Sequence, residues 1–241
     1  MTRTWPRILP CGDMAITVEF GATIDESVNR RVIGLERVVE NENLPGVIET
    51  VPTYRSLLVH LDPLTADHAS LSKTLSRLAR AIAPQAQSRR RWKVPVIYGG
   101  EFGEDLAMLA DLHGISEERV AELHVQAVYR VYMVGFVPGF TYLGGLDPRL
   151  TTPRRKTPRQ RIPPGTISIG GQQSAIGSIE APSGWHLIGC TPVRCFHPHR
   201  DPVFLFRPGD EVCLEPVGAA AWDQLAKRAA AGEMVASCET G

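Results

Sequence analysis

The sequence has no helical periodicity from Tyr129 to Ala219, and this stretch limits the possible fold more than any other feature. Short segments rich in β-branched and aromatic residues alternate there with glycine and proline, which interrupt regular structure. Many short strands separated by turn residues favour a β-barrel or a β-sandwich. The expected strands cover residues 129–134, 166–169, 186–188, 203–206 and 211–214.

The first part of the chain has a different pattern, in which strands alternate with amphipathic helices. Strand patterns cover residues 15–20, 47–51 and 57–61, and helical spacing follows Asp25 and recurs from Leu71 to Ile82. One more strand, at residues 92–97, could belong to either part of the chain. The order strand, helix, strand, strand, helix, strand is that of a ferredoxin-like domain.

We therefore predict an α+β protein with two domains and a short tail. The ferredoxin-like domain covers residues 1–88, the β-barrel domain covers residues 89–218, and a C-terminal helix and tail cover residues 219–241. The expected linker is at residues 84–91, where Gln, Ser and three arginines follow a proline. Residues 234–241 are expected to fray.

Charge and composition limit the partners and the location. The chain has 26 basic and 26 acidic residues, so a general attraction to nucleic acid or to a membrane surface is not expected. No segment is long and apolar enough for a membrane helix, and we expect a cytoplasmic protein. The five cysteines include no Cys-x-x-Cys pair, and His197 and His199 have no third ligand near them, so no metal site is predicted.

The first candidate site is the loop from Gly135 to Gly145, which combines glycines and a proline with three aromatic residues. Glycine allows close approach of the backbone, and aromatic rings supply flat apolar surface. The side chains of Phe136, Phe140 and Tyr142 could therefore form the rim of a pocket for a small ligand. Ordinary core packing would explain two of the rings equally well.

A basic run follows, with Arg154, Arg155, Lys156, Arg159 and Arg161 held between prolines and with no acidic residue among them. Prolines restrict the backbone, and an oriented cation binds a carboxylate or a phosphate better than a mobile one. The alternative is a solvated loop whose charges face water.

Amide and imidazole groups form a third candidate set. Gln172 and Gln173 lie among glycines, where they could bind an amide or a lactam through hydrogen bonds, although a glycine-rich hairpin turn would have the same composition. His186 follows Trp185 and is a further candidate substrate-binding residue. Asp147 and Glu180 are the acids nearest to these loops, and either could act as a general base, but their spacing does not select one.

These segments resemble the signature of the family that contains the 5-oxoprolinase B subunit, also called allophanate hydrolase subunit 1, and related kinase-inhibitor proteins. Gly12-Asp13, the block from Val51 to Leu58 and the block from Tyr98 to Gly103 resemble further family blocks in the same order. The resemblance implies that the barrel is cyclophilin-like. It also places the family's Thr-Pro-Arg element on Thr157 to Arg159, and this selects Lys156 and Arg159 as binding cations.

The resemblance implies a subunit of an ATP-dependent 5-oxoprolinase, which converts 5-oxoproline, ATP and water to glutamate, ADP and phosphate. Such a subunit acts with a homologous larger subunit and a separate third subunit on a small anionic or amide substrate. The sequence has no Gly-x-x-x-x-Gly-Lys-Ser/Thr loop, so ATP is expected to bind through the complex. The alternatives are a histidine-kinase inhibitor and an allophanate or urea-pathway hydrolase subunit.

The chain departs from the family pattern at several positions of the candidate site. Where the family commonly has Gln-Thr-Gly-Ile-Tyr-Pro, this chain has Gln173-Ser174-Ala175-Ile176-Gly177-Ser178. Cys190 replaces a common arginine, and Ser183 replaces a common glycine. These changes remove a tyrosine, a proline and a cation that could contact substrate.

Overall fold

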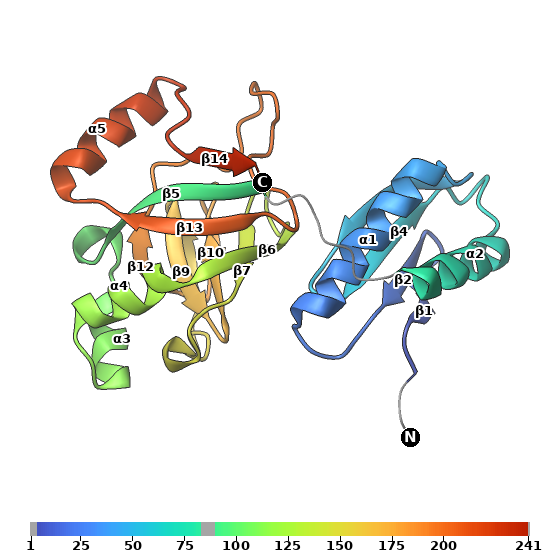
Figure 1. Ribbon diagram of the computed structural model, residues 1–241, viewed down its shortest axis with the longest axis horizontal. Coiled ribbons are helices and arrows are strands. Elements are labelled where there is room, and N and C mark those ends of the chain that lie inside the picture. The colour runs from blue at the N-terminus through green and yellow to red at the C-terminus, as the bar shows by residue number, and fades with distance from the viewer. Residues whose placement is uncertain (1–3, 83–89, 241) are drawn as a thin grey trace. The chain divides into compact units, whose positions relative to one another are not determined.

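The computed structural model describes residues 4–82 and 90–240, and it divides the chain into two compact units, Met1–Gln87 and Ser88–Gly241 (Figure 1). Each unit has its own cluster of buried hydrophobic residues. Residues 84–89 of the expected linker lie outside the described residues, and Arg90 and Arg91 begin a strand.

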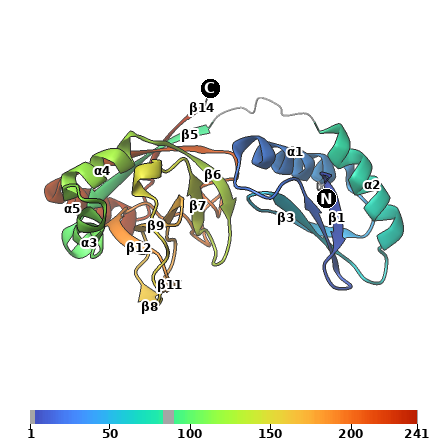
Figure 2. The ribbon, with the colours of Figure 1, turned by 90° about the horizontal axis from the view of Figure 1, so that it is seen from below.

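The first unit is a four-stranded antiparallel sheet with two helices on one face (Figure 2). The strands lie in the order β1-β2-β4-β3. The elements are β1 (Arg7–Pro10), β2 (Ala15–Glu19), α1 (Glu26–Glu42), β3 (Val47–Pro52), β4 (Ser56–Leu61) and α2 (His68–Ala81).

Local sequence explains these elements well. In β4 every second side chain is buried, which places Leu57, Val59 and Leu61 against the helices. The carboxylate of Asp25 accepts a hydrogen bond from the Val28 amide and caps α1. Asp67 caps α2 in the same way through the amides of Ala69 and Ser70.

The predicted order of strands and helices in this unit lacks the first strand. The sheet starts with β1, which pairs with β2 from Arg7 opposite Glu19 to Pro10 opposite Ile16. β1 has only four residues and no fully buried side chain, so it lacks the alternation that identifies a strand. The strand at residues 92–97, which could have belonged to either part, lies in the barrel.

The second unit is built around a closed barrel. Its elements are β5 (Arg90–Tyr98), η1 (Gly100–Phe102), α3 (Leu106–His113), α4 (Glu117–Gln126), β6 (Val128–Val134), β7 (Thr141–Gly144), η2 (Pro148–Leu150), β8 (Arg159–Ile162), β9 (Thr166–Gly170), β10 (Gln173–Ile176), β11 (Ala181–Ser183), β12 (His186–Cys190), β13 (Glu211–Pro216), α5 (Ala219–Ala230) and β14 (Ser237–Thr240).

Seven strands close the barrel in the order β12-β9-β10-β7-β6-β13-β5, because the end of β5 also pairs with β12. Of the β-barrel and the β-sandwich that the sequence pattern left open, the structure has the barrel, as the family resemblance implied. β5 is long enough to pair with β14 at its start and with β12 at its end. β8 and β11 form a separate two-stranded ribbon (Figure 2).

Two local predictions in this unit are wrong. Residues 203–206 do not form a strand, and Phe204 makes only an isolated bridge to Phe196, since Pro202 and Pro208 restrict the backbone on both sides. The end of the chain does not fray in the described residues, because β14 pairs with β5 from Ser237 to Thr240.

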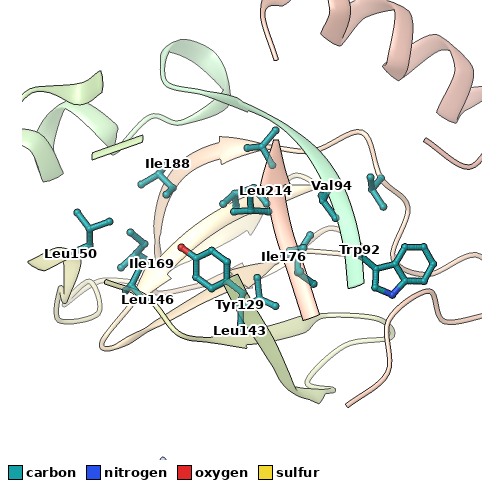
Figure 3. Close-up of a cluster of buried hydrophobic side chains, with 14 of the residues drawn as sticks. Trp92, Val94, Tyr129, Leu143, Leu146, Leu150, Ile169, Ile176, Ile188 and Leu214 are labelled. Atoms are coloured by element: carbon teal, nitrogen blue, oxygen red, sulfur yellow. The ribbon is translucent and has the colours of Figure 1, made fainter. Parts of the chain in front are cut away.

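Side chains fill the barrel interior, as Figure 3 shows for Tyr129, Leu143, Ile169, Ile176 and Leu214. The filled interior leaves the outer surface and the loops for binding. One polar group of the interior is His124 of α4, which is completely buried. Its Nδ1 lies 2.8 Å from the Tyr98 hydroxyl, and its Nε2 lies 2.9 Å from the Ser174 hydroxyl.

His124 should make the stability of the fold depend on pH. Burial lowers the pKa of His124 from its ordinary value of 6.5 to about 3. Above pH 6.5 the imidazole is neutral in both states, whereas between those two values only the unfolded chain binds the proton. The free energy of unfolding should therefore fall by about 1.4 kcal/mol for each pH unit of acidification through this window.

The measurement is denaturant unfolding of the wild type and of His124→Gln at several pH values. The difference between the two profiles isolates the imidazole, even if the variant is less stable at every pH. Profiles that stay parallel from pH 7 to pH 4 would contradict a neutral, buried His124.

Candidate functional site

An aromatic cluster lies on the outer face of the barrel. Phe140, Ala175 and Trp185 are buried together there, and Tyr142 packs against them. The Tyr142 ring centroid is 4.8 Å from that of Phe140 and 5.8 Å from that of Trp185. Gly170 allows the indole to lie on the strand, because a Cβ atom at Gly170 would be 2.5 Å from the Trp185 ring.

Three buried polar atoms on the same face of the sheet lack a hydrogen-bond partner among the described residues. They are Nε2 of Gln173, Oγ of Ser168 and Oγ1 of Thr166. Gln173 lies opposite Gly170, and Ser168 lies opposite Ala175, whereas Ile169 and Ile176 face the interior. An unpaired buried polar group is costly, so this face can accept a ligand or a water that supplies hydrogen bonds.

The basic run lies beside this cluster. The guanidinium of Arg154 lies over the Trp185 ring, 5.3 Å from its centroid. Burial raises the pKa of Tyr142, and the positive charge of Arg154 opposes that rise. The Arg155 amide donates a 2.7 Å hydrogen bond to the Gly184 carbonyl, which fixes the loop next to Trp185.

We call the set Phe140, Tyr142, Arg154, Gln173 and Trp185 the aromatic–basic surface. Its members are the exposed Arg154, the half-buried Tyr142 and the buried Phe140, Trp185 and Gln173, and Nε2 of Gln173 lacks a hydrogen-bond partner among the described residues. Lys156 is exposed two residues after Arg154, and no ion pair of Lys156 occurs among residues 4–82 and 90–240. The basic run can therefore offer Arg154 and Lys156 to an anionic ligand.

Arg159 is placed differently, because a buried carboxylate holds it. Asp105 accepts two hydrogen bonds of 2.9 Å from Arg159, one of 3.1 Å from Arg155 and one of 2.7 Å from the Leu187 amide. Burial alone would raise the pKa of Asp105, but these hydrogen bonds and the two positive charges outweigh it and lower the pKa. Arg159 also pairs with Glu104 at 3.2 Å. Both terminal nitrogens of Arg159 thus donate within the chain.

The remaining candidates are spread over the unit. Nε2 of His186 lies 2.8 Å from the Pro153 carbonyl oxygen, while its buried Nδ1 lacks a partner among the described residues. Gln172 is exposed in the turn between β9 and β10. Hydrogen bonds from Arg149 lower the pKa of Asp147 to about 2. Glu180 is exposed and lies 3.4 Å from Arg161.

The aromatic loop lines an apolar cleft of about 500 Å³. Of the three aromatic residues in the loop, only Phe136 is among the lining residues, because Phe140 and Tyr142 belong to the aromatic–basic surface. The other walls come from residues 202–208. We refer to this hollow as the Phe136 cleft.

A second hollow, of about 640 Å³, lies against α5 and contains Ser178, Glu180 and Cys190 in its lining. Burial raises the pKa of Cys190 to about 11, so its thiol is not a reactive thiolate at neutral pH. The Ser178 hydroxyl donates a short hydrogen bond to the Pro138 carbonyl. A side chain at Gly177 would meet Thr166, since a Cβ atom there would be 2.5 Å from Oγ1.

Sequence reasoning missed three residues that organise the site. The sequence pattern marked Trp185 only as the neighbour of His186, Ser168 was not considered for binding, and the pairing of Asp105 with two arginines was not predicted. The period-two pattern of residues 166–170 does place Ser168 opposite the buried isoleucines, so that signal was available. The pairing of Asp105 with Arg159 spans 54 residues, and no sequence pattern predicts it.

No group of three or more His, Cys, Asp or Glu residues that could hold a metal occurs among the described residues. Within the same residues, no helix has the length and apolar character needed to cross a bilayer.

The ion-pair hub at Asp105 should be structural. Asp105→Ala leaves two guanidinium groups without their carboxylate and should lower the free energy of unfolding by about 3–5 kcal/mol. Arg159→Ala should also destabilise the fold, while Lys156→Ala should not. Thermal unfolding of the three variants tests this, with Arg161→Ala as the control, because that side chain is 80% exposed. An unchanged melting temperature for Asp105→Ala would contradict this role.

Comparison with known proteins gives consistent matches. Residues 6–206 match the family model described as carboxyltransferase domain, subdomain C and D. The chain is 38% identical over 212 residues to the 5-oxoprolinase B subunit of Bacillus subtilis (strain 168), covering 83% of this chain and 88% of that protein. It is 37% identical over 209 residues to the 5-oxoprolinase B subunit of Escherichia coli O157:H7, covering 85% of this chain and 93% of that protein.

A solved structure, that of TTHA0988, matches with a TM-score of 0.76 and 35% identity over 85% of this chain. The match covers only 40% of the TTHA0988 chain.

Proposed function

Because the chain belongs to the family of the carboxyltransferase domain, subdomain C and D, we propose that it is the B subunit of an ATP-dependent 5-oxoprolinase. The observation that carries the proposal is its 35–38% identity to three 5-oxoprolinase B subunits over most of its length. The reaction converts 5-oxoproline, ATP and water to glutamate, ADP and phosphate. Its substrate is a five-membered lactam that carries a carboxylate.

The aromatic–basic surface has groups that suit this substrate. Arg154 and Lys156 can bind the carboxylate, and the half-buried ring of Tyr142 can contact the flat lactam. The unpaired amide of Gln173 can donate a hydrogen bond to the lactam carbonyl. When water attacks that carbon, negative charge grows on the carbonyl oxygen, and a donor already in place stabilises it.

The general base stays a choice between two acids. Asp147 is a weak base, because its pKa is about 2 and Arg149 occupies its carboxylate. Glu180 is exposed and pairs with Arg161 at the longer distance of 3.4 Å, which leaves its carboxylate more available, so we favour Glu180. His186 and Gln172 are proposed to bind substrate at the edge of the aromatic–basic surface.

The proposal includes partners, compartment and fold type. The relatives are named as subunits, and we propose that this chain works with a homologous larger subunit and that ATP binds through the complex. We expect the complex in the cytoplasm, with no role for nucleic acid or a membrane. The first unit is proposed to be ferredoxin-like and the second cyclophilin-like. The proposed domain limits are residues 1–88 and 89–218, followed by the C-terminal helix and tail at residues 219–241.

Reconstitution tests the function. Purified chain mixed with the larger subunit, the third subunit and ATP should form glutamate and ADP from 5-oxoproline in equal amounts, while the chain alone should form neither. Arg154→Ala and Lys156→Ala should raise KM, because each removes a cation that binds the carboxylate. Arg77→Ala is the control, because Arg77 is exposed on α2 of the first unit and belongs to none of the proposed binding groups. A reconstituted complex that turns over another amide but not 5-oxoproline would exclude this assignment.

Gln173 allows catalysis to be separated from folding. Gln173→Leu removes a buried polar atom that has no partner among the described residues, so the melting temperature should stay the same or rise. The same change removes the proposed donor to the carbonyl oxygen and should lower kcat by about 100-fold or more. Calorimetry and steady-state kinetics on one preparation give both quantities. A large loss of stability with unchanged kcat would show that Gln173 is structural.

A further inference from the structure

The Phe136 cleft is an apolar hollow next to the proposed substrate surface but outside it. It is lined by valine, phenylalanine and proline side chains, and Arg207 is the charged residue in the lining. A small anionic lactam would find few hydrogen-bonding groups there. A cleft of this composition suits an apolar side chain of another polypeptide.

Three large apolar side chains around the cleft are exposed. The exposed fractions are 63% for Phe136, 43% for Phe204 and 36% for Val203. Scattered apolar residues are common on protein surfaces, but three of them around one hollow mark an interaction site.

The backbone conformation of Phe136 also indicates an interaction site. Its φ angle is +76°, in the left-handed region that costs an ordinary residue free energy. A ring held in this way and still mostly exposed contributes little to the core of the isolated chain. Strain of this kind is retained where a side chain serves a function.

The walls of the cleft are held in position by hydrogen bonds. The Gly135 amide donates to the Phe140 carbonyl, and the Leu205 amide donates to the Cys195 carbonyl. Arg200 donates from Nε to the Pro202 carbonyl and from Nη1 to the Arg194 carbonyl. Gly139 lets the loop approach Phe196, because a Cβ atom there would be 2.7 Å from that of Phe196, and Phe196 forms a bridge with Phe204 of the other wall. A cleft built in advance binds with a smaller loss of entropy.

We infer that the Phe136 cleft receives a large apolar side chain of the larger subunit and anchors the complex. The inference rests on the proposed function, which supplies the partner. Arg207 has an exposed side chain with no ion pair among the described residues, so it fits an acidic residue beside the anchor. In TTHA0988 the region that matches this chain makes up only 40% of a longer polypeptide, so a relative of this fold is joined to further protein.

The position of the cleft gives the docking a consequence for the reaction. The Phe136 ring meets the Phe140 ring edge to face, with centroids 5.8 Å apart. Phe140 in turn packs under Tyr142 and Trp185. A partner seated in the cleft therefore lies directly beside the aromatic–basic surface and can complete the substrate site.

The test measures the affinity of the purified larger subunit for four versions of the chain. Val203→Asp places a charge in the apolar wall and should raise Kd by about tenfold or more. Phe136→Gly should raise Kd similarly while the melting temperature stays the same or increases, because glycine adopts this backbone conformation without strain. Leu112→Ser on α3 is the control, since Leu112 is 60% exposed and lies outside the cleft lining; its Kd should equal that of the wild type.

Unchanged affinity in both cleft variants would overturn the inference, as would a wild-type chain that does not bind the larger subunit. A wild-type homodimer that Val203→Asp dissociates would also overturn it, because a second copy would then occupy the cleft. The proposed function has a separate readout: a complex that forms through the cleft but does not cleave 5-oxoproline would refute the function and leave the docking site in place.

Discussion

The carboxylate of Asp105 holds together the parts of the second unit that surround the candidate site. It is buried at the start of α3, and it binds two arginines of the basic run and the Leu187 amide of β12. Three segments far apart in the sequence meet at this one group. Without it the two arginines would repel each other, and the loop that carries Arg154 and Lys156 would lose its fixed position beside Trp185.

This arrangement separates the roles of the cations in the basic run. A guanidinium that a buried carboxylate already binds cannot release its donors to a ligand without exposing an unpaired charge. Arg155 and Arg159 therefore position the loop, while Arg154 and Lys156 remain available to bind. The cations of the basic run thus have different roles, and contact with Asp105 distinguishes those that position the loop from those that can bind a ligand.

The sequence predicted local structure well and long-range contacts poorly, for a physical reason. Hydrophobic periodicity records which face of an element is buried, so the helix after Asp25 and strands such as β4 could be predicted from neighbouring residues. The closure of the barrel depends on β5 pairing with β12, about 90 residues further along the chain, and no local pattern encodes that contact. β1 was missed because it has only four residues, none of them fully buried, and this carries too weak a signal.

The same reasoning explains which site residues could be predicted. Composition identified the aromatic loop and the basic run. It could not show that Phe136, which has a left-handed backbone conformation, lines the cleft while Phe140 and Tyr142 belong to the aromatic–basic surface. Folding favours sequences in which each local choice agrees with the whole, so exceptions gather where binding requires them. The unpaired amide of Gln173 and the strained, exposed ring of Phe136 are two such exceptions. Phe140 links the two regions, because it is buried with Trp185 in the aromatic cluster and its ring meets the Phe136 ring edge to face, so one buried ring connects the place where substrate is proposed to bind with the place where a partner is proposed to dock.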